Sequence, residues 1–243
     1  PHLPRAAEIL TGRGVVDDPV AGRRDPALEP ADRFRDVEVA AVQYPGRADR
    51  LSESCVDRVD VLADAIASEL CVDRPTVLFG HSFGAAVAYE VAGRLAPYDW
   101  NLHLVVSGRA SPRHQRRGTK HLGTDDELWA DVASLGGTPD EVLGHDELRD
   151  YALPALRSDY RASETWDPVG PTLRMPVAAY IGNEDQEVDA VMASGWSDVT
   201  TGPFLLRRFD GGHFYLVPKQ REVVCAVLEL LELPVGCADV TGP

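Results

Sequence analysis

The sequence predicts an α/β protein with a mostly parallel central sheet and helices on both of its faces. From about residue 36 onward, short β-branched runs alternate with longer amphipathic stretches. One run, TVLF at residues 76–79, is apolar throughout, which is typical of a strand buried on both sides. The composition, 44% hydrophobic and 26% charged over 243 residues, fits a globular chain. We therefore expect a single α/β domain over residues 1–243.

The first elements follow the order that a parallel sheet requires. Residues 37–43 (VEVAAVQ) indicate a buried strand, and the turn-forming Tyr44-Pro45-Gly46 ends it. Apolar residues then recur at three- and four-residue steps between residues 56 and 70, which predicts a helix. Pro75 separates that helix from the strand at residues 76–79. A strand, a helix and a second strand in this order predict one crossover unit.

The net charge excludes two classes of partner. Asp and Glu number 39 against 24 Lys and Arg, so the formal charge is −15, the wrong sign for binding nucleic-acid phosphates or anionic lipid. No apolar run reaches the roughly 18 residues of a membrane span, and residues 1–20 lack the apolar centre of a signal peptide. We expect neither a nucleic-acid partner nor a membrane partner.

The cysteines do not predict a metal site. They have no C-x-x-C spacing and no neighbouring histidine in a zinc-like pattern. We interpret all four as free thiols in a reducing cytoplasm and expect no bound metal. They are Cys55, Cys71, Cys225 and Cys237.

A G-x-S-x-G sequence, GHSFG at residues 80–84, lies between the strand at residues 76–79 and a helical run that opens with small residues. This is the setting of a nucleophile elbow, in which glycines let strand and helix pack closely around an exposed serine. Ser82 is therefore the predicted nucleophile. The backbone N–H of Phe83 is the predicted donor to an oxyanion.

A serine nucleophile needs a histidine base and a carboxylate that orients the histidine. We expect both downstream of the serine, first the acid and then the histidine. His213 follows the strand-like residues 204–209 on a glycine-rich loop. Asp185 lies 28 residues before it, just after the strand-like residues 177–181. We choose Asp185 as the orienting acid and interpret its neighbours Glu184 and Asp189 as solvated loop charges.

Six segments together resemble the discrete type II thioesterases of polyketide and nonribosomal peptide assembly lines. They cover roughly residues 36–220, and the PGR turn, the SGR strand end and the GGHFY ending are narrower signals than G-x-S-x-G alone. The segments are QYPGR (43–47), GHSFG (80–84), SGR (107–109), LRSDY (156–160), TGPF (201–204) and GGHFY (211–215).

The resemblance implies an α/β-hydrolase fold and hydrolysis of acyl groups from the phosphopantetheine thiol of acyl or peptidyl carrier proteins. Ser82, Asp185 and His213 match the triad positions of the family. No cofactor is implied, because the pantetheine arm belongs to the carrier. The implied role is editing of aberrant or stalled acyl units, although release of intermediates would use the same chemistry.

The N-terminal residues 1–35 depart from that family. Its members open with a Pro-His-Ala-Gly-Gly loop that supplies the second oxyanion donor, whereas the nearest match here is Pro-Val-Ala-Gly-Arg at residues 19–23. Residues 5–35 are also poor in strand pattern. Three interpretations fit: a divergent working loop around Ala21, a defective oxyanion hole, or a sequence error. We place the second donor at Ala21.

A helical insertion that we expect to form a lid spans about residues 121–165. Helices are predicted at residues 125–135, 138–143 and 146–160, with Thr124 and Thr138 as caps of the first two. The basic run at residues 113–120 lies just before it. It is either a docking patch for the carrier protein, which is acidic in these pathways, or a solvated loop.

Two other functions remain open at this point. A small-molecule carboxylesterase would use the same triad, and it would turn over free esters faster than acyl carrier proteins. A non-catalytic binding module on a decayed hydrolase fold is favoured only by the atypical N-terminus.

Overall fold

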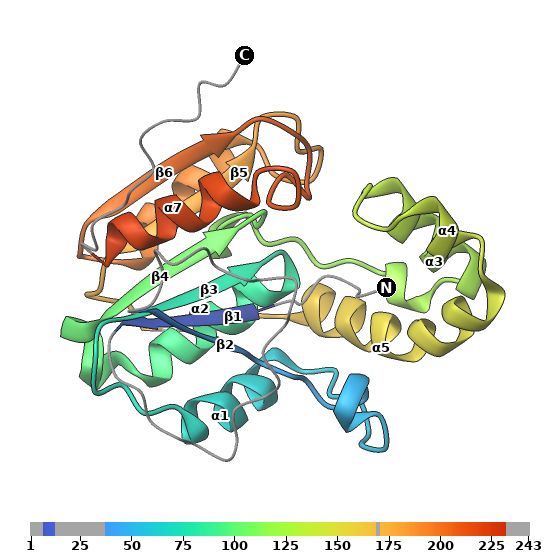
Figure 1. Ribbon diagram of the computed structural model, residues 1–243, viewed down its shortest axis with the longest axis horizontal. Coiled ribbons are helices and arrows are strands. Elements are labelled where there is room, and N and C mark those ends of the chain that lie inside the picture. The colour runs from blue at the N-terminus through green and yellow to red at the C-terminus, as the bar shows by residue number, and fades with distance from the viewer. Residues whose placement is uncertain (1–6, 13–36, 169–170, 232–243) are drawn as a thin grey trace.

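The computed structural model describes residues 7–12, 37–168 and 171–231. Six strands form one sheet in the order β2-β1-β3-β4-β5-β6 within this part of the chain. The strands β3 to β6 are parallel, and β1 runs antiparallel to both of its neighbours (Figure 1). The expected mostly parallel sheet is confirmed. The strands are β1 (Ala7–Gly12), β2 (Val37–Ala41), β3 (Thr76–His81), β4 (Leu102–Ser107), β5 (Val177–Gly182) and β6 (Phe204–Phe209).

Strand β1 forms within residues 5–35, where the sequence is poor in strand pattern. It lies between β2 and β3, and its register pairs Ala7 with Gly80 and Thr11 with Thr76. Its sequence, AEILTG, includes a charge and a glycine in six residues, so the local pattern is weak. Hydrogen bonding to a strand on each side decides the conformation here.

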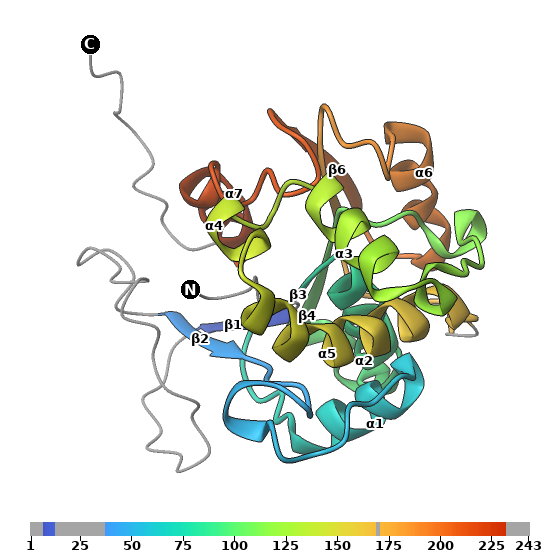
Figure 2. The same ribbon diagram turned by 90° about the vertical axis from the view of Figure 1, so that its right-hand side faces the viewer.

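Helices cover both faces of the sheet, because neighbouring strand residues point to opposite sides. On β5, Ala179 and Ile181 belong to the core with α1 and α2, while Ala178 and Tyr180 belong to the core with α7. Figure 2 shows these layers from the side of the molecule. The helices are α1 (Val59–Glu69), α2 (Phe83–Arg94), α6 (Ala190–Ser194) and α7 (Gln220–Leu230), and the 3₁₀ turns are η3 (Ala48–Arg50), η4 (Ala96–Asn101), η5 (Pro112–His114), η6 (Lys120–Leu122) and η7 (Gly195–Val199).

Three helices between β4 and β5, called here the lid helices, are α3 (Asp125–Ser134), α4 (Asp140–Leu143) and α5 (Asp146–Thr165). They lie together at one side of the sheet (Figure 1). Thr124 caps α3 as expected, in a reciprocal capping box with Glu127. The expected cap Thr138 is wrong, because Pro139 occupies the N-cap of α4. The lid helices share a small apolar core of their own, which includes Leu128, Trp129 and Leu153.

The expectation of four free thiols is wrong. Cys225 on α7 takes part in a disulfide, whereas Cys55 and Cys71 are free. Cys237 lies outside the described residues. No helix among the described residues is long and apolar enough to cross a membrane.

Candidate active site

Ser82 occupies a sharp turn between the end of β3 and the start of α2. Its backbone has φ 52° and ψ −115°, a region that costs strain for a residue with a side chain. Its N–H donates to the carbonyl oxygen of Ser107 on the neighbouring strand β4, at 2.7 Å. Phe83, as the first residue of α2, has a main-chain N–H that the helix leaves without an acceptor.

The glycines of the GHSFG segment allow this turn. A Cβ atom at Gly80 would lie 2.1 Å from the carbonyl oxygen of Gly84 and 2.7 Å from Cα of Ala85. The strand and the helix therefore approach each other more closely than any side chain at position 80 permits. The geometry is that of a nucleophile elbow, with Ser82 at its apex.

His213 and Asp185 meet at the carboxyl ends of β5 and β6. Nδ1 of His213 lies 2.9 Å from Oδ2 of Asp185, and the two side chains are only 6% and 0% exposed. The second carboxylate oxygen, Oδ1, accepts the N–H of Glu187 at 2.9 Å. Both oxygens of Asp185 are thus hydrogen-bonded, so the carboxylate is held in one orientation against the imidazole.

The loops that carry these two residues pack backbone to backbone. The N–H of Glu184 donates to the carbonyl oxygen of Gly211 at 2.9 Å. A Cβ at Gly182 would lie 2.3 Å from the carbonyl oxygen of Gly212. Asp189, by contrast, caps α6 by accepting the N–H of Met192, and Glu184 is exposed. Of Glu184, Asp185 and Asp189, only Asp185 is hydrogen-bonded to His213.

The His213 ring lies next to the elbow but is not hydrogen-bonded to its serine. Its centroid is 4.8 Å from that of His81, the residue before Ser82. No hydrogen bond joins Ser82 to His213 within the described structure, which is common before a substrate is bound. A serine at a strained apex, beside an imidazole oriented by a buried carboxylate, is arranged for nucleophilic acyl transfer.

A hydrogen-bonded chain beneath His213 was not expected from the sequence. Nδ1 of His81 lies 2.9 Å from Oγ of Ser107, which lies 2.6 Å from the hydroxyl of Tyr215. Burial, and secondarily the nearby His213, lowers the pKa of His81 well below its usual value. His81 is therefore neutral at pH 7. The SGR and GGHFY segments contain Ser107 and Tyr215, but nothing in the sequence joins them.

The position after Ser107 has room only for a glycine, Gly108. Its φ is +57°, and a Cβ there would lie 2.7 Å from Cε1 of His81 and 3.1 Å from Cε1 of His213. Both imidazoles therefore rest against the backbone of this residue.

Arg47 of the PGR turn holds lid helix α5 to the body of the protein. Its two terminal nitrogens donate to the two carboxylate oxygens of Asp159 at 2.7 and 2.8 Å. The guanidinium also lies over the ring of Tyr44, 5.3 Å from its centroid. Tyr44 in turn contacts Phe83 edge to face, at 5.8 Å between ring centroids. This contact series connects the lid to the elbow.

Arg109 of the SGR segment makes a second connection to α5. It donates to Oγ of Ser163 at 2.6 Å and to Oε1 of Gln115 at 2.8 Å, and its guanidinium lies 5.0 Å from the ring of Trp166. Burial lowers the pKa of Arg109 to about 10. Its partners among these contacts are neutral, so it is an uncompensated buried cation at the base of the lid.

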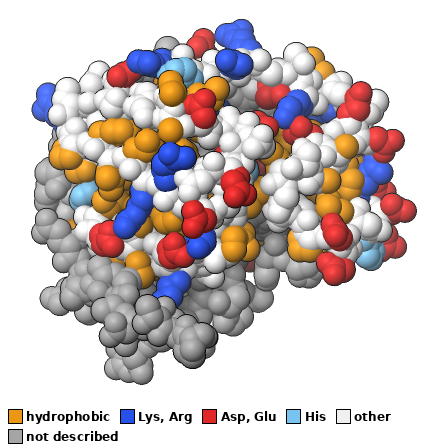
Figure 3. Space-filling view, turned by 90° about the horizontal axis from the view of Figure 1, so that it is seen from above, with side chains coloured by type: hydrophobic (Ala, Val, Ile, Leu, Met, Phe, Trp, Pro, Cys, Tyr) orange, Lys and Arg blue, Asp and Glu red, His pale blue; other side chains and the backbone are white. Residues whose placement is uncertain are grey.

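The basic run at residues 113–120 is largely paired with acids. Arg113 pairs with Asp198, Arg117 with Asp167 and Lys120 with Asp131. These pairs favour the solvated-loop interpretation over a docking patch. The lid residues 121–165 carry eleven Asp and Glu against three Arg and no Lys. Figure 3 shows acidic side chains gathered on its right-hand part, where Figure 1 places the lid helices.

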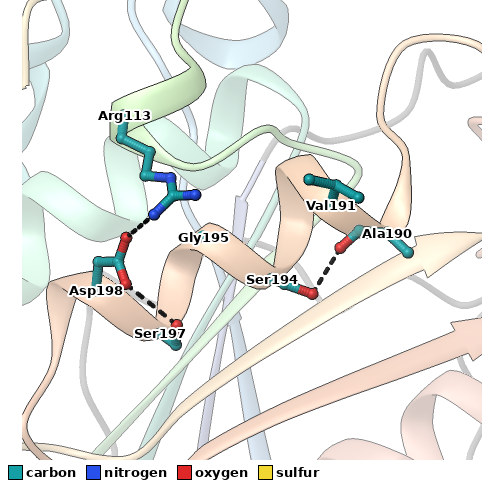
Figure 4. A pocket seen from close by; sticks show the side chains of 7 residues that line it. All are labelled: Arg113, Ala190, Val191, Ser194, Gly195, Ser197 and Asp198. Carbon is teal, nitrogen blue, oxygen red and sulfur yellow. Dashed lines mark hydrogen bonds and ion pairs between the residues drawn. The ribbon is translucent and has the colours of Figure 1, made fainter.

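A surface hollow of about 360 Å³ lies apart from the three predicted triad residues, none of which lines it. Arg113 pairs with Asp198 at one end of the lining, and the other lining residues belong to α6 and η7 (Figure 4). Among the described residues, no group of three or more His, Cys, Asp or Glu is placed to hold a metal ion. Ala21 lies outside the described residues.

Comparisons with known proteins agree with this geometry. Residues 30–231 match the family model described as a thioesterase domain. The chain is 45% identical over 183 residues to a probable cadicidin biosynthesis thioesterase of Streptomyces griseus, covering 74% of this chain and 51% of that protein. It is 36% identical over 210 residues to Thioesterase PikA5 of Streptomyces venezuelae, covering 84% and 74%. The chain thus spans about half the length of the first of these relatives.

Solved structures give the same result. The type II thioesterase BorB from the borrelidin biosynthetic cluster superposes with a TM-score of 0.72 at 42% identity, covering 79% of this chain and 80% of that one. The RedJ thioesterase from the prodiginine pathway of Streptomyces coelicolor superposes with a TM-score of 0.70 at 34% identity, covering 78% and 74%. The α/β-hydrolase fold expected from the sequence is confirmed.

Proposed function

Because this chain belongs to the thioesterase-domain family, we propose that it hydrolyses acyl groups from the phosphopantetheine thiol of acyl or peptidyl carrier proteins. The pathway is polyketide or nonribosomal peptide biosynthesis, and the role is editing of aberrant or stalled acyl units. A similar solved structure, the type II thioesterase YbtT, is named as part of the yersiniabactin NRPS/PKS pathway. The observation that carries the proposal is the buried Asp185–His213 pair beside the elbow of Ser82. The cellular location that follows is the cytoplasm.

The reaction proceeds in two acyl transfers. Oγ of Ser82 attacks the thioester carbonyl carbon as its proton passes to Nε2 of His213. Asp185 accepts the Nδ1–H of His213 and stabilises the imidazolium. The tetrahedral intermediate collapses, the carbon–sulfur bond breaks, and His213 returns the proton to the leaving thiol. Water then attacks the acyl-serine by the same path, and the carboxylic acid leaves.

Two N–H donors stabilise the oxyanion in this scheme. The first is the N–H of Phe83, whose position at the start of α2 leaves it free and at the positive end of the helix dipole. The second comes from the segment around Ala21. Loss of one such donor typically costs about 10²–10³ in rate, so an enzyme without this second donor would be slow rather than inactive.

The test is hydrolysis of an acetyl- or propionyl-carrier protein by the unaltered chain and by Ser82→Ala. Turnover should vanish in the serine variant. Asp185→Asn should lower kcat by about 10³–10⁴-fold, because the amide no longer fixes the imidazole tautomer. Asp189→Asn is the matched control: it changes an acid on the same loop, and asparagine caps a helix as well as aspartate does.

The rival functions predict different results. A carboxylesterase would process p-nitrophenyl esters with a higher kcat/KM than acyl carrier proteins. A binding module would bind the carrier protein while the unaltered chain and Ser82→Ala were equally inert. Either outcome would contradict the proposal, as would full activity in Asp185→Asn.

A further inference from the structure

The lid contacts the loop of His213 at one glycine. A Cβ atom at Gly137, in the turn between α3 and α4, would lie 2.3 Å from Cδ2 and 2.4 Å from Cε2 of Phe214. The Phe214 ring therefore rests directly on the backbone of the lid. The φ angle of Gly137 is not positive, whereas that of Gly136 is +74°. A side chain at position 137 would therefore be excluded by the Phe214 ring and not by the backbone conformation.

Phe214 also contacts the imidazole it follows in sequence. Its ring stands edge to face against His213, with centroids 5.2 Å apart and planes at 87°. It lies 5.3 Å from the His81 ring as well. The His213 ring is thus held by the hydrogen bond to Asp185 and by contacts with the rings of His81 and Phe214. The Phe214 ring in turn contacts the lid at Gly137.

The third lid helix, α5, is held by two arginine side chains of the body. Helix α5 is joined to the body by the bidentate pair of Arg47 and Asp159 and by the hydrogen bonds of Arg109 to Ser163. The turn that contains Gly137 joins α3 to α4, and it contacts Phe214. A shift of α3 and α4 would therefore reach the His213 loop through this aromatic ring.

We propose that Phe214 is a positioning residue through which the lid turn at Gly137 sets the orientation of His213 toward Ser82. The inference rests on the proposed function and adds a coupling between lid and base. A misplacement of about 1 Å in a reacting group can cost 10²-fold in rate. A small displacement of the His213 ring by this contact would therefore lower the rate measurably. The lid then controls the chemistry itself as well as the space for the acyl chain.

The first variant is Gly137→Ala, which adds one methyl group where Phe214 lies. It should lower kcat for an acetyl-carrier protein by about 10- to 100-fold and change KM by less than about threefold. The matched control is Gly144→Ala in the same lid, where a Cβ would meet only the carbonyl oxygen of Asp140 at an ordinary 3.5 Å. That control should keep the activity of the unaltered chain. Circular dichroism and thermal unfolding confirm that each variant is folded.

Combining variants tests the coupling. If Phe214 carries the effect, Gly137→Ala should have almost no further effect once Phe214→Ala has removed the ring, and the double variant should match Phe214→Ala within about threefold. Independent effects would multiply instead. Multiplying effects, or a Gly137→Ala variant as active as Gly144→Ala, would overturn the proposal.

A second readout does not depend on the substrate. A small alkyl fluorophosphonate is attacked by Oγ of Ser82, forming an oxygen–phosphorus bond and releasing fluoride while the serine proton passes to His213. Gly137→Ala should slow this labelling in parallel with kcat. If labelling is unchanged while KM rises, the lid acts on acyl binding alone and the inference is wrong. If labelling behaves as expected and no carrier protein is hydrolysed, the proposed substrate fails but the coupling stands.

Discussion

The ion pair between Arg47 and Asp159 predicts a different pH response for the two variants that break it. Nη1 of Arg47 lies 2.7 Å from Oδ2 of Asp159, and Nη2 lies 2.8 Å from Oδ1. The exposed fraction is 24% for the Arg47 side chain and 17% for that of Asp159. Burial raises the pKa of Asp159, although the hydrogen bond from Arg47 opposes it. Each partner is thus largely removed from water, and the loss of either leaves the other without its counterion.

Asp159→Asn leaves the guanidinium of Arg47 buried beside a neutral amide. Breaking a buried pair in this way costs about 3–5 kcal/mol, and the residual exposure of both side chains places this pair at the lower end, about 3 kcal/mol. For a chain of this size that corresponds to a fall of about 6–12 °C in Tm. Arginine does not lose its proton in proteins, so the guanidinium stays charged without its counterion at both pH 5 and pH 8, and the variant should be destabilised at both.

Arg47→Met leaves a carboxyl group that can respond to pH. Without Arg47, only burial acts, and the pKa of Asp159 in the folded state rises further above its unfolded value near 4. Between those two pKa values the folded state binds more protons than the unfolded state, so stability falls as pH rises through that window. The variant should therefore be closer to the unaltered protein at pH 5 than at pH 8.

Urea unfolding at both pH values measures these differences. Arg58→Met, which breaks an exposed pair with Asp60, is the control and should leave the midpoint unchanged. The double variant Arg47→Met with Asp159→Leu removes both charges and should lie within about 1 kcal/mol of the unaltered chain. An Asp159→Asn variant that loses less than about 1 kcal/mol, or an Arg47→Met cost that is larger at pH 5, would refute the reasoning.

Three further predictions concern the elbow and the lid. Gly80→Ala would place a Cβ 2.1 Å from the carbonyl oxygen of Gly84, so it should destabilise the protein by about 3 kcal/mol in urea unfolding; an unchanged midpoint would contradict the tight packing. Because the pKa of His81 is lowered in the folded state, its imidazole takes up a proton in the unfolded state before it does so in the folded state as the pH falls below about 6.5. The stability advantage of the unaltered chain over His81→Asn should therefore shrink by about 1 kcal/mol per pH unit below that value, and a constant difference between pH 7.5 and 5.5 would argue against a buried neutral imidazole. Thr124→Ala removes the capping box with Glu127 and should cost about 1 kcal/mol, with faster amide hydrogen exchange in the first turn of α3; unchanged exchange there would show that the cap contributes nothing.

The central part of the fold and the candidate site were accessible from sequence because each depends on local signals. The GHSFG segment encodes its own geometry, since the glycines and the serine lie within one turn. Asp185 and His213 follow successive strands of a parallel sheet, and the carboxyl ends of such strands meet at one edge. The 28 residues that separate them in sequence therefore did not hide their contact.

The errors occurred where tertiary partners decide the outcome. Strand β1 has a weak pattern of its own and is defined by its pairing with β2 and β3. The cap of α4 shifted by one residue, from Thr138 to Pro139, within a helix of only four residues. The disulfide of Cys225 has no signature in cysteine spacing. Only for β1 do the described contacts show that distant parts of the chain, β2 and β3, decide the conformation.

Five of the six segments that carry the family resemblance, all except TGPF, are connected by contacts in space that no spacing in the sequence could reveal. Arg47 of the PGR turn reaches Asp159 in LRSDY, 112 residues away, and Arg109 of SGR reaches the same lid helix at Ser163, 54 residues away. Phe214 of GGHFY contacts the lid turn at Gly137. Each of these segments thus joins the lid to the elbow or to the histidine loop. The terminal nitrogens of both guanidinium groups donate to acceptors of this chain, which include Asp159 and Ser163 of α5. These contacts hold α5 against the body, while the turn at Gly137 contacts the loop of His213 through Phe214.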